Sequence, residues 1–75
     1  MAARYRVGVI GCGGIATAHL QAYRRLPSVE VVAGAEPSDE ARRRWTEELG
    51  VLRMYATAEE MLEREQPDIV SICTW

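Results

Sequence analysis

Apolar residues are arranged along this chain in two alternating ways. Short continuous runs fall at residues 4–10, 29–35, 51–55 and 69–74, and valine and isoleucine are frequent in them. A continuous apolar run bounded by turn residues is typical of a strand in a parallel sheet, where helices cover both faces. We therefore predict four strands in these ranges, of which the third is short.

Between the first two runs, apolar residues recur three or four positions apart, which is the spacing of an amphipathic helix. This helix is predicted to begin at residue 13 or 14 and to extend to about residue 25. It ends before Pro27, because proline cannot continue a helix. Its predicted buried stripe consists of Ile15, Ala18, Ala22 and Leu26.

Two further helices are predicted, each with a polar residue that can cap its first turn. Ser38 can cap the second helix, which ends near Gly50. Thr57 and Glu60 form a capping box for the third helix, which ends before Pro67. The predicted buried residues are Ala41, Trp45 and Leu49 in the second helix and Ala58, Met61 and Leu62 in the third.

Strand and helix patterns alternate through the whole chain. Such alternation predicts an α/β fold with a parallel sheet joined by right-handed crossovers. If the sheet is doubly wound, these four strands lie in the order 3-2-1-4, the first half of a Rossmann-type sheet. With 75 residues, the chain is half or less of a usual domain.

A glycine-rich turn joins the first predicted strand to the first helix. Gly11, Gly13 and Ala16 form the pattern G-x-G-x-x-A. In a dinucleotide-binding turn, the first glycine permits the tight turn, the second lets the backbone approach a pyrophosphate, and the small third residue lets the helix pack close to the sheet. The first amides of the helix, at Gly14 and Ile15, can then bind phosphate oxygens with help from the helix dipole.

An acidic residue ends the second predicted strand. Glu36 lies about 20 residues after Ala16, where a carboxylate in this fold accepts hydrogen bonds from both hydroxyls of the adenosine ribose. The alternative is a glycine turn in some other α/β fold, with Glu36 as a solvated strand end. Because a carboxylate repels the 2′-phosphate of NADP, NAD is predicted to bind more tightly than NADP. The opposite preference would need Ser38 or the arginines at 42–44 to hold that phosphate, and a solvated helix face is the simpler interpretation of those arginines.

The remaining reactive residues give weaker signals. His19 lies one turn beyond the phosphate-binding amides, where it is either a proton donor or, more simply, a helix residue with local hydrogen bonds. Cys12 and Cys73 follow neighbouring strands, and they are either a reactive pair or two small buried residues. The lone histidine and the scattered acids form no metal-ligand pattern.

Charge and composition narrow the range of partners. The net charge of −2 gives no electrostatic case for binding nucleic acid or an anionic membrane. No apolar run approaches the ~18 residues of a membrane span, and none resembles a secretion signal. Two cysteines do not make a disulfide framework. A reducing cytoplasm is therefore the expected location.

The order of these motifs resembles one known family. "RVGVIGCGGIATAHLQAY" is followed by a strand that ends in "AEPSDEARRRW", and then by "MYATAEEMLE" and "PDIVSICT". Across essentially the whole chain, these motifs resemble the N-terminus of the Gfo/Idh/MocA oxidoreductases, the family of glucose-fructose oxidoreductase and inositol dehydrogenase. The resemblance implies an NAD(P)-binding Rossmann portion of an oxidoreductase, which transfers a hydride between the nicotinamide cofactor and a sugar or polyol.

The resemblance also implies cofactor-binding residues. The turn that binds the pyrophosphate is matched by Gly11, Gly13, Gly14 and Ile15, the ribose-binding acid by Glu36, and the end of the strand beside the cofactor by Cys73 and Thr74. Trp75 stands where proline is common in the family, and a bulky residue there could line the cofactor cleft.

Other parts that the resemblance implies are missing from this sequence. The family's catalytic lysine lies in a Glu-Lys-Pro motif after the next helix and strand, whereas this sequence has no lysine. The family's second domain supplies substrate contacts and oligomer interfaces, so a homo-oligomer is implied for the full-length protein. We therefore expect residues 1–75 to be the N-terminal part of a dinucleotide-binding domain, with no catalytic residue and no dehydrogenase activity by itself. Two alternatives stay open, an NAD-sensing protein without turnover and a module that binds another adenine nucleotide, such as coenzyme A.

Overall fold

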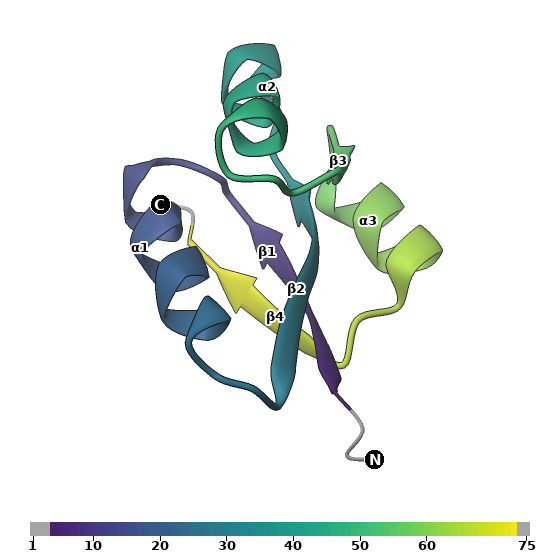
Figure 1. Cartoon of the computed structure of the whole chain (residues 1–75). Coiled ribbons are helices and arrows are strands. Elements are labelled where there is room, and N and C mark those ends of the chain that lie inside the picture. The colour runs from purple at the N-terminus through teal and green to yellow at the C-terminus, as the bar shows by residue number, and fades with distance from the viewer. Residues whose placement is uncertain (1–3, 74–75) are drawn as a thin grey trace.

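The computed structural model of the chain describes residues 4–73. Strands and helices alternate strictly along it (Figure 1). The elements are β1 (Tyr5–Ile10), α1 (Gly14–Arg24), β2 (Val29–Ala35), α2 (Asp39–Glu47), β3 (Arg53–Tyr55), α3 (Ala58–Glu65) and β4 (Ile69–Ile72). The predicted alternation is confirmed, and the predicted extension of the last strand to Thr74 lies outside the described residues.

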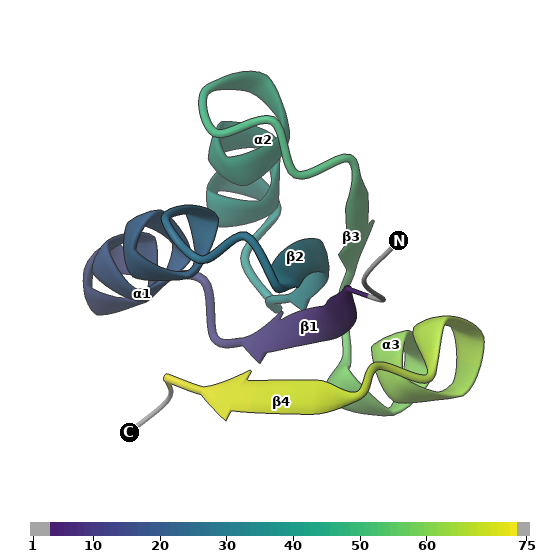
Figure 2. The same cartoon turned by 60° about the horizontal axis from the view of Figure 1, so that its bottom comes forward.

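The strands form one parallel sheet in the order β3-β2-β1-β4, as predicted for a doubly wound fold. Helices α1 and α2 lie on one face and α3 lies on the other (Figure 2). Side chains alternate along the strands, so each face has its own hydrophobic cluster. Val7, Val9 and Trp45 belong to the cluster under α1 and α2, and Ala33 and Met61 belong to the cluster under α3.

The buried face of α1 differs from the predicted one. Ala16 and Leu20 are fully buried, whereas all four residues of the predicted stripe (Ile15, Ala18, Ala22, Leu26) are exposed. The helix has small or apolar residues on both sides, so its spacing does not decide which side meets the sheet. The close approach at Ala16, directly after the glycine turn, selects the side that carries Leu20.

The other two helices follow their predicted caps more closely. The Ser38 hydroxyl accepts a hydrogen bond from the Ala41 amide at 3.2 Å, and Thr57 accepts one from the Glu60 amide at 3.2 Å. Trp45 and Met61 are fully buried, as predicted. Ala41, Leu49 and Ala58 are half-buried. Gly50, with φ at 73°, follows α2 in the left-handed conformation that favours glycine.

The prediction for Leu62 in α3 is wrong, because its side chain is 39% exposed. The residues of α3 that face the sheet are instead Ala58, Met61 and Glu65, which are spaced three and four positions apart. Glu65 is only 6% exposed and was not singled out from the sequence. A charged residue thus occupies a helical position where an apolar residue would be expected.

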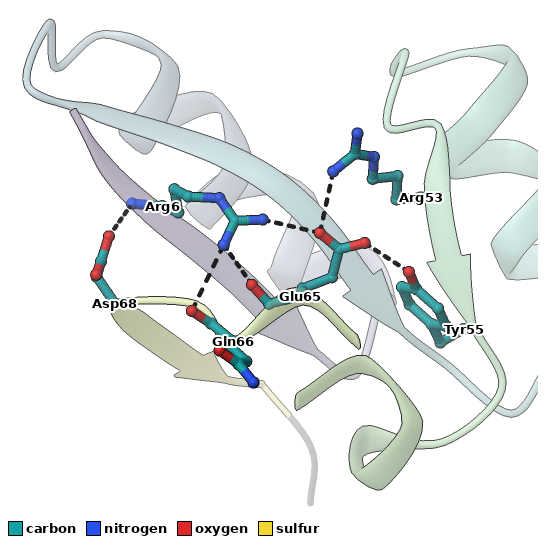
Figure 3. Close-up of polar contacts among 6 residues, drawn as sticks. All are labelled: Arg6, Arg53, Tyr55, Glu65, Gln66 and Asp68. Carbon is teal, nitrogen blue, oxygen red and sulfur yellow. Dashed lines mark hydrogen bonds and ion pairs between the residues drawn. The ribbon is translucent and has the colours of Figure 1, made fainter. Parts of the chain in front are cut away.

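The Glu65 carboxylate is satisfied by three side chains from the strands (Figure 3). Its Oε1 accepts from Arg6 at 2.9 Å and from Arg53 at 3.2 Å, and its Oε2 accepts from the Tyr55 hydroxyl at 2.5 Å. The hydrogen bond from Tyr55 and the two arginines lower the pKa of Glu65, and the bond to Glu65 raises the pKa of Tyr55. This group ties the end of α3 to β1 and β3.

Arg6 also fixes the connection from α3 to β4. Its guanidinium donates to the backbone oxygens of Glu65 and Gln66, and its backbone amide donates to Asp68 Oδ2 at 2.8 Å. Gln66 has φ at 46°, so the chain reverses in the left-handed region directly after the helix. These contacts position β4 beside β1, which places the carboxyl ends of both strands together.

Candidate cofactor-binding site

The glycine turn lies at the carboxyl end of β1 and leads directly into α1. Gly11 has φ at 84°, a conformation that side chains rarely adopt, and its amide donates to the Ala35 oxygen at the end of β2, at 2.8 Å. Gly13 is extended and is the N-cap of α1. The first amides of α1, at Gly14 and Ile15, have no acceptor within the helix and point toward its N-terminal end. They are therefore suited to bind an anion there.

The glycines of the chain have different reasons to be glycine. A Cβ atom built on Gly34 would lie 2.9 Å from the Cys12 sulfur, so packing requires glycine there. A Cβ atom on Gly13 or Gly14 would meet nothing within 4 Å. Neither packing nor a positive φ explains these two residues. Open space beside unpaired amides fits the requirement that a pyrophosphate approach the backbone closely.

Glu36, the first residue after β2, is not a solvated strand end. It is half-buried, and its Oε1 accepts from the Cys12 amide in the glycine turn at 2.9 Å. Its Oε2 accepts from the Ser38 amide at 2.8 Å. The carboxylate thus joins the turn after β1 to the turn after β2. Each carboxylate oxygen has a second lone pair, which leaves it able to accept from a ribose hydroxyl.

A hollow of about 260 Å³ separates the glycine turn from α2. It is lined by Cys12, Gly13 and Gly14 on one side and by Ser38, Glu40, Ala41 and Arg44 on the other. The site has room beside the free amides at the start of α1 and a carboxylate at the end of β2. The residues present therefore fit an adenine dinucleotide.

A single solvated helix face would require the three arginines of α2 to be equally exposed, and they are not. Arg42 donates Nη1 to the backbone oxygens of Glu36 and Pro37, at 2.7 and 3.0 Å, and pairs with Asp39. Arg43 is exposed, and Arg44 lines the hollow. Of these three arginines, Arg43 alone lies on a solvated helix face as predicted.

Cys12 and Cys73 are both free thiols at the carboxyl ends of neighbouring strands. Cys12 is fully buried, and burial together with the nearby Glu36 charge raises the pKa of its thiol to about 12. Cys12 is therefore an inert packing residue near neutral pH, which favours the simpler of the two interpretations. The Cys73 amide donates to the Ile10 oxygen at 2.8 Å and continues the β1–β4 pairing to the edge of the site.

Ile15 and His19 both lie on α1. The Ile15 side chain is 67% exposed, so only its amide belongs to the turn. His19 is exposed on α1. Thr74, like Trp75, lies outside the described residues. Arg44 was noted only as part of an arginine run, and its place in the hollow was not predicted.

Residues 4–73 contain neither a metal-binding cluster nor a membrane-spanning helix. No group of three or more His, Cys, Asp or Glu side chains there is arranged to hold a metal ion. None of the helices in the same range has the length and apolarity that crossing a membrane needs.

Residues 5–75 match the model of an oxidoreductase family with an NAD-binding Rossmann fold. The chain is 37% identical over 71 residues to D-apiose dehydrogenase of Paraburkholderia graminis, and the alignment covers 95% of this chain and 19% of that protein. It is 30% identical over 69 residues to myo-inositol 2-dehydrogenase of Thermotoga maritima, with 92% of this chain and 21% of the relative covered. The chain thus spans about a fifth of the length of these two relatives.

A solved structure agrees with these matches. The WlbA dehydrogenase from Chromobacterium violaceum, in complex with NADH and UDP-GlcNAcA, superimposes with a TM-score of 0.85 at 28% sequence identity. The superposition covers 95% of this chain and 21% of that one. The chain therefore belongs to the Gfo/Idh/MocA oxidoreductases, a family with an NAD-binding Rossmann fold.

Proposed function

We propose that the protein containing this chain is an NAD-dependent oxidoreductase, which moves a hydride between the nicotinamide ring and a carbinol carbon of a sugar or polyol. The observation that carries this proposal is the open space at Gly13 and Gly14. These two glycines stand beside unpaired helix amides, and neither a positive φ nor close packing accounts for them. A pyrophosphate that approaches the backbone requires such small residues.

Within this chain, we assign every role to binding and orienting the cofactor. Gly11 and Gly13 shape the turn, and the amides of Gly14 and Ile15 bind the pyrophosphate. Glu36 accepts hydrogen bonds from the adenosine ribose while it holds the glycine turn, and this favours NAD over NADP. We assign Cys73, which follows β4, to the cofactor further along the sheet edge, and Thr74, which lies outside the described residues, is assigned the same role from the sequence alone.

When bound, NAD supplies the hydride chemistry, and the protein supplies binding, orientation and electrostatics. We assign the proton-transfer group and the substrate contacts to parts of the protein outside residues 1–75. The lengths of the relatives support this division, since the alignments cover 19% and 21% of them. On this proposal, residues 1–75 alone bind the cofactor without turnover.

The substrate class is supported by the names of the two relatives, which act on D-apiose and myo-inositol. Both compounds are polyhydroxylated. We extend the same class to this protein, together with a homo-oligomeric full-length form. A reducing compartment such as the cytoplasm suits its two free thiols.

The test is NAD titration of the purified protein and of its Gly13→Val variant. An added Cβ at Gly13 meets no atom, but Gly13 is the N-cap of α1 and valine is a poorer N-cap than glycine, so the variant should stay folded with a loss of at most about 1 kcal/mol. We expect NAD affinity to fall at least tenfold, because the side chain would fill the space that the pyrophosphate needs. Ala18→Val, at an exposed position of the same helix, is the matched control.

Unchanged NAD affinity in Gly13→Val would contradict the assigned phosphate site. Turnover is followed as NADH formation with a panel of sugars and polyols on the full-length protein. Tight NAD binding without turnover of any of them would favour the sensing alternative, and displacement of NAD by coenzyme A would favour the other nucleotide module.

A further inference from the structure

Arg44 has no role in the proposed function, yet its position in the fold is unusual for an arginine of α2. Its side chain lines the hollow opposite Gly13 and Gly14, and it lies in the middle of α2 rather than in the turn after β2. Its neighbours in the sequence are both accounted for, since Arg42 is bonded to the backbone and Arg43 is exposed to solvent. Arg44 is therefore the arginine of α2 that the hollow brings near the glycine turn.

The charge of Arg44 is not neutralised within the described part of the chain. Its Nε is buried without a hydrogen-bond partner. Among residues 4–73, each observed ion pair uses another arginine: Arg6, Arg42, Arg53 or Arg64. Arg44 as a whole is half-buried, so its charge is partly solvated, but a buried polar atom that lacks a partner still needs an explanation. A bound anion would supply the missing partner.

The hollow restricts what that anion can be. Its other wall is the glycine turn, and the amides at the start of α1 favour negative charge on the same side. Glu40 also lines the hollow, and its negative charge opposes an anion, so the anion has to lie toward Arg44 and the helix amides. Guanidinium groups match phosphate oxygens with paired N–H donors.

We propose that Arg44 is a further cofactor-binding residue, which donates to a phosphate oxygen of the dinucleotide across the hollow from the glycine turn. This inference rests on the proposed function, because it requires a dinucleotide in the site. The phosphate is either part of the pyrophosphate or the 2′-phosphate of NADP, and ligands that carry one or the other distinguish the two.

The experiment compares Arg44→Met with the matched control Arg43→Met and the charge-preserving Arg44→Lys. Affinities of the purified proteins are measured by calorimetry for NAD, ADP, 2′,5′-ADP and adenosine at constant salt. We expect Arg44→Met to weaken ADP and NAD binding about tenfold and adenosine binding less than twofold, because adenosine has no phosphate. Arg43→Met should bind all four ligands as the parent does, and Arg44→Lys should recover part of the loss.

The pattern of losses assigns the phosphate. A loss with ADP and NAD identifies the pyrophosphate, whereas a loss confined to 2′,5′-ADP identifies the 2′-phosphate, and either supports the inference. Equal affinity of Arg44→Met and the parent for every phosphate ligand overturns it. An equal loss with adenosine, or in Arg43→Met, also overturns it, because the effect would then not come from a phosphate contact at Arg44. If the unaltered protein binds none of the nucleotides, the proposed function fails and this inference fails with it.

Discussion

Replacement of Glu36 by alanine is expected to destabilise the protein even when no cofactor is present. The carboxylate accepts from the amides of Cys12 and Ser38, at 2.9 and 2.8 Å. Cys12 is fully buried, so its amide would lose its acceptor in a place that water does not reach. Ser38 is exposed, so water can replace the lost acceptor there.

The magnitude follows from this difference between the two amides. A buried donor without a partner costs about 1–3 kcal/mol, whereas an exposed one costs close to nothing. We therefore expect Glu36→Ala to lower the free energy of unfolding by about 2 kcal/mol. Glu36→Gln keeps an oxygen that can accept from Cys12, so its cost should stay below about 1 kcal/mol. Because the glutamine is neutral, the proposed bonds to the ribose would lose their charge assistance, and NAD affinity should still fall about tenfold.

Urea unfolding of the unliganded proteins at neutral pH measures the first effect, and NAD titration of the glutamine variant measures the second. Glu63→Ala is the control, since Glu63 is exposed on α3 and a surface change there should alter stability by less than about 0.5 kcal/mol. If Glu36→Ala unfolds at the same urea concentration as the parent and with the same slope, Cys12 has another acceptor and Glu36 does not hold the turn.

Three further predictions concern the fold and the thiols. Glu65→Gln should lower stability by about 1–2 kcal/mol at pH 7. The pKa of Glu65 is lowered in the folded state, so ionised Glu65 contributes to the free energy of unfolding above the ordinary glutamate pKa, and this contribution is lost as the pH falls through the folded value. If the variant and the parent differed equally in urea unfolding at pH 7 and at pH 3, this reasoning would be wrong. Gly14→Ala should raise the unfolding free energy of the unliganded protein by about 0.4–1 kcal/mol, because the added Cβ meets nothing and alanine is less flexible than glycine in the unfolded chain. A lower melting temperature of the variant would show that the Cβ clashes. Burial raises the pKa of Cys12 to about 12, so iodoacetamide at pH 8 should modify it only after unfolding, as peptide mass mapping would show.

The sheet could be predicted because each strand and helix carries a local signal. Apolar runs, caps and glycine or proline ends identify the elements, and strict alternation leaves few topologies to choose from. The face of α1 could not be predicted in the same way. Spacing gives the period of a helix but not its phase when both sides are apolar, and the approach at Ala16 decides the phase only in three dimensions.

The contacts that fix α3 could not be predicted from the sequence for a different reason. Glu65 and Arg6 are 59 positions apart, and Arg53 and Tyr55 reach Glu65 from another strand. Taken by its sequence neighbours alone, Glu65 is one of several acidic residues on a helix surface. Only the sheet order brings two arginines and a hydroxyl to one carboxylate, which makes a charged residue acceptable at a buried position.

The candidate site was predictable in outline because the carboxyl ends of parallel strands meet at one edge of the sheet. Gly11 follows β1, Glu36 follows β2 and Cys73 follows β4, so the topology places them together. Two contacts depended on the folded chain, namely the bond from the Cys12 amide to Glu36 and the position of Arg44 in the hollow. Neither has a fixed spacing in the sequence that would have identified it.

On the proposed function, the bond between Glu36 and Cys12 links cofactor choice to the stability of the site. The carboxylate that we propose to disfavour a 2′-phosphate also satisfies a buried amide of the glycine turn. A small neutral residue at this position would remove the repulsion of NADP, but it would also leave that amide without an acceptor. A change of preference at this position is therefore easiest with a residue that keeps an acceptor and loses the charge, as glutamine does. The same reasoning makes the length of the side chain important, because the acceptor has to reach from the end of β2 to the turn after β1.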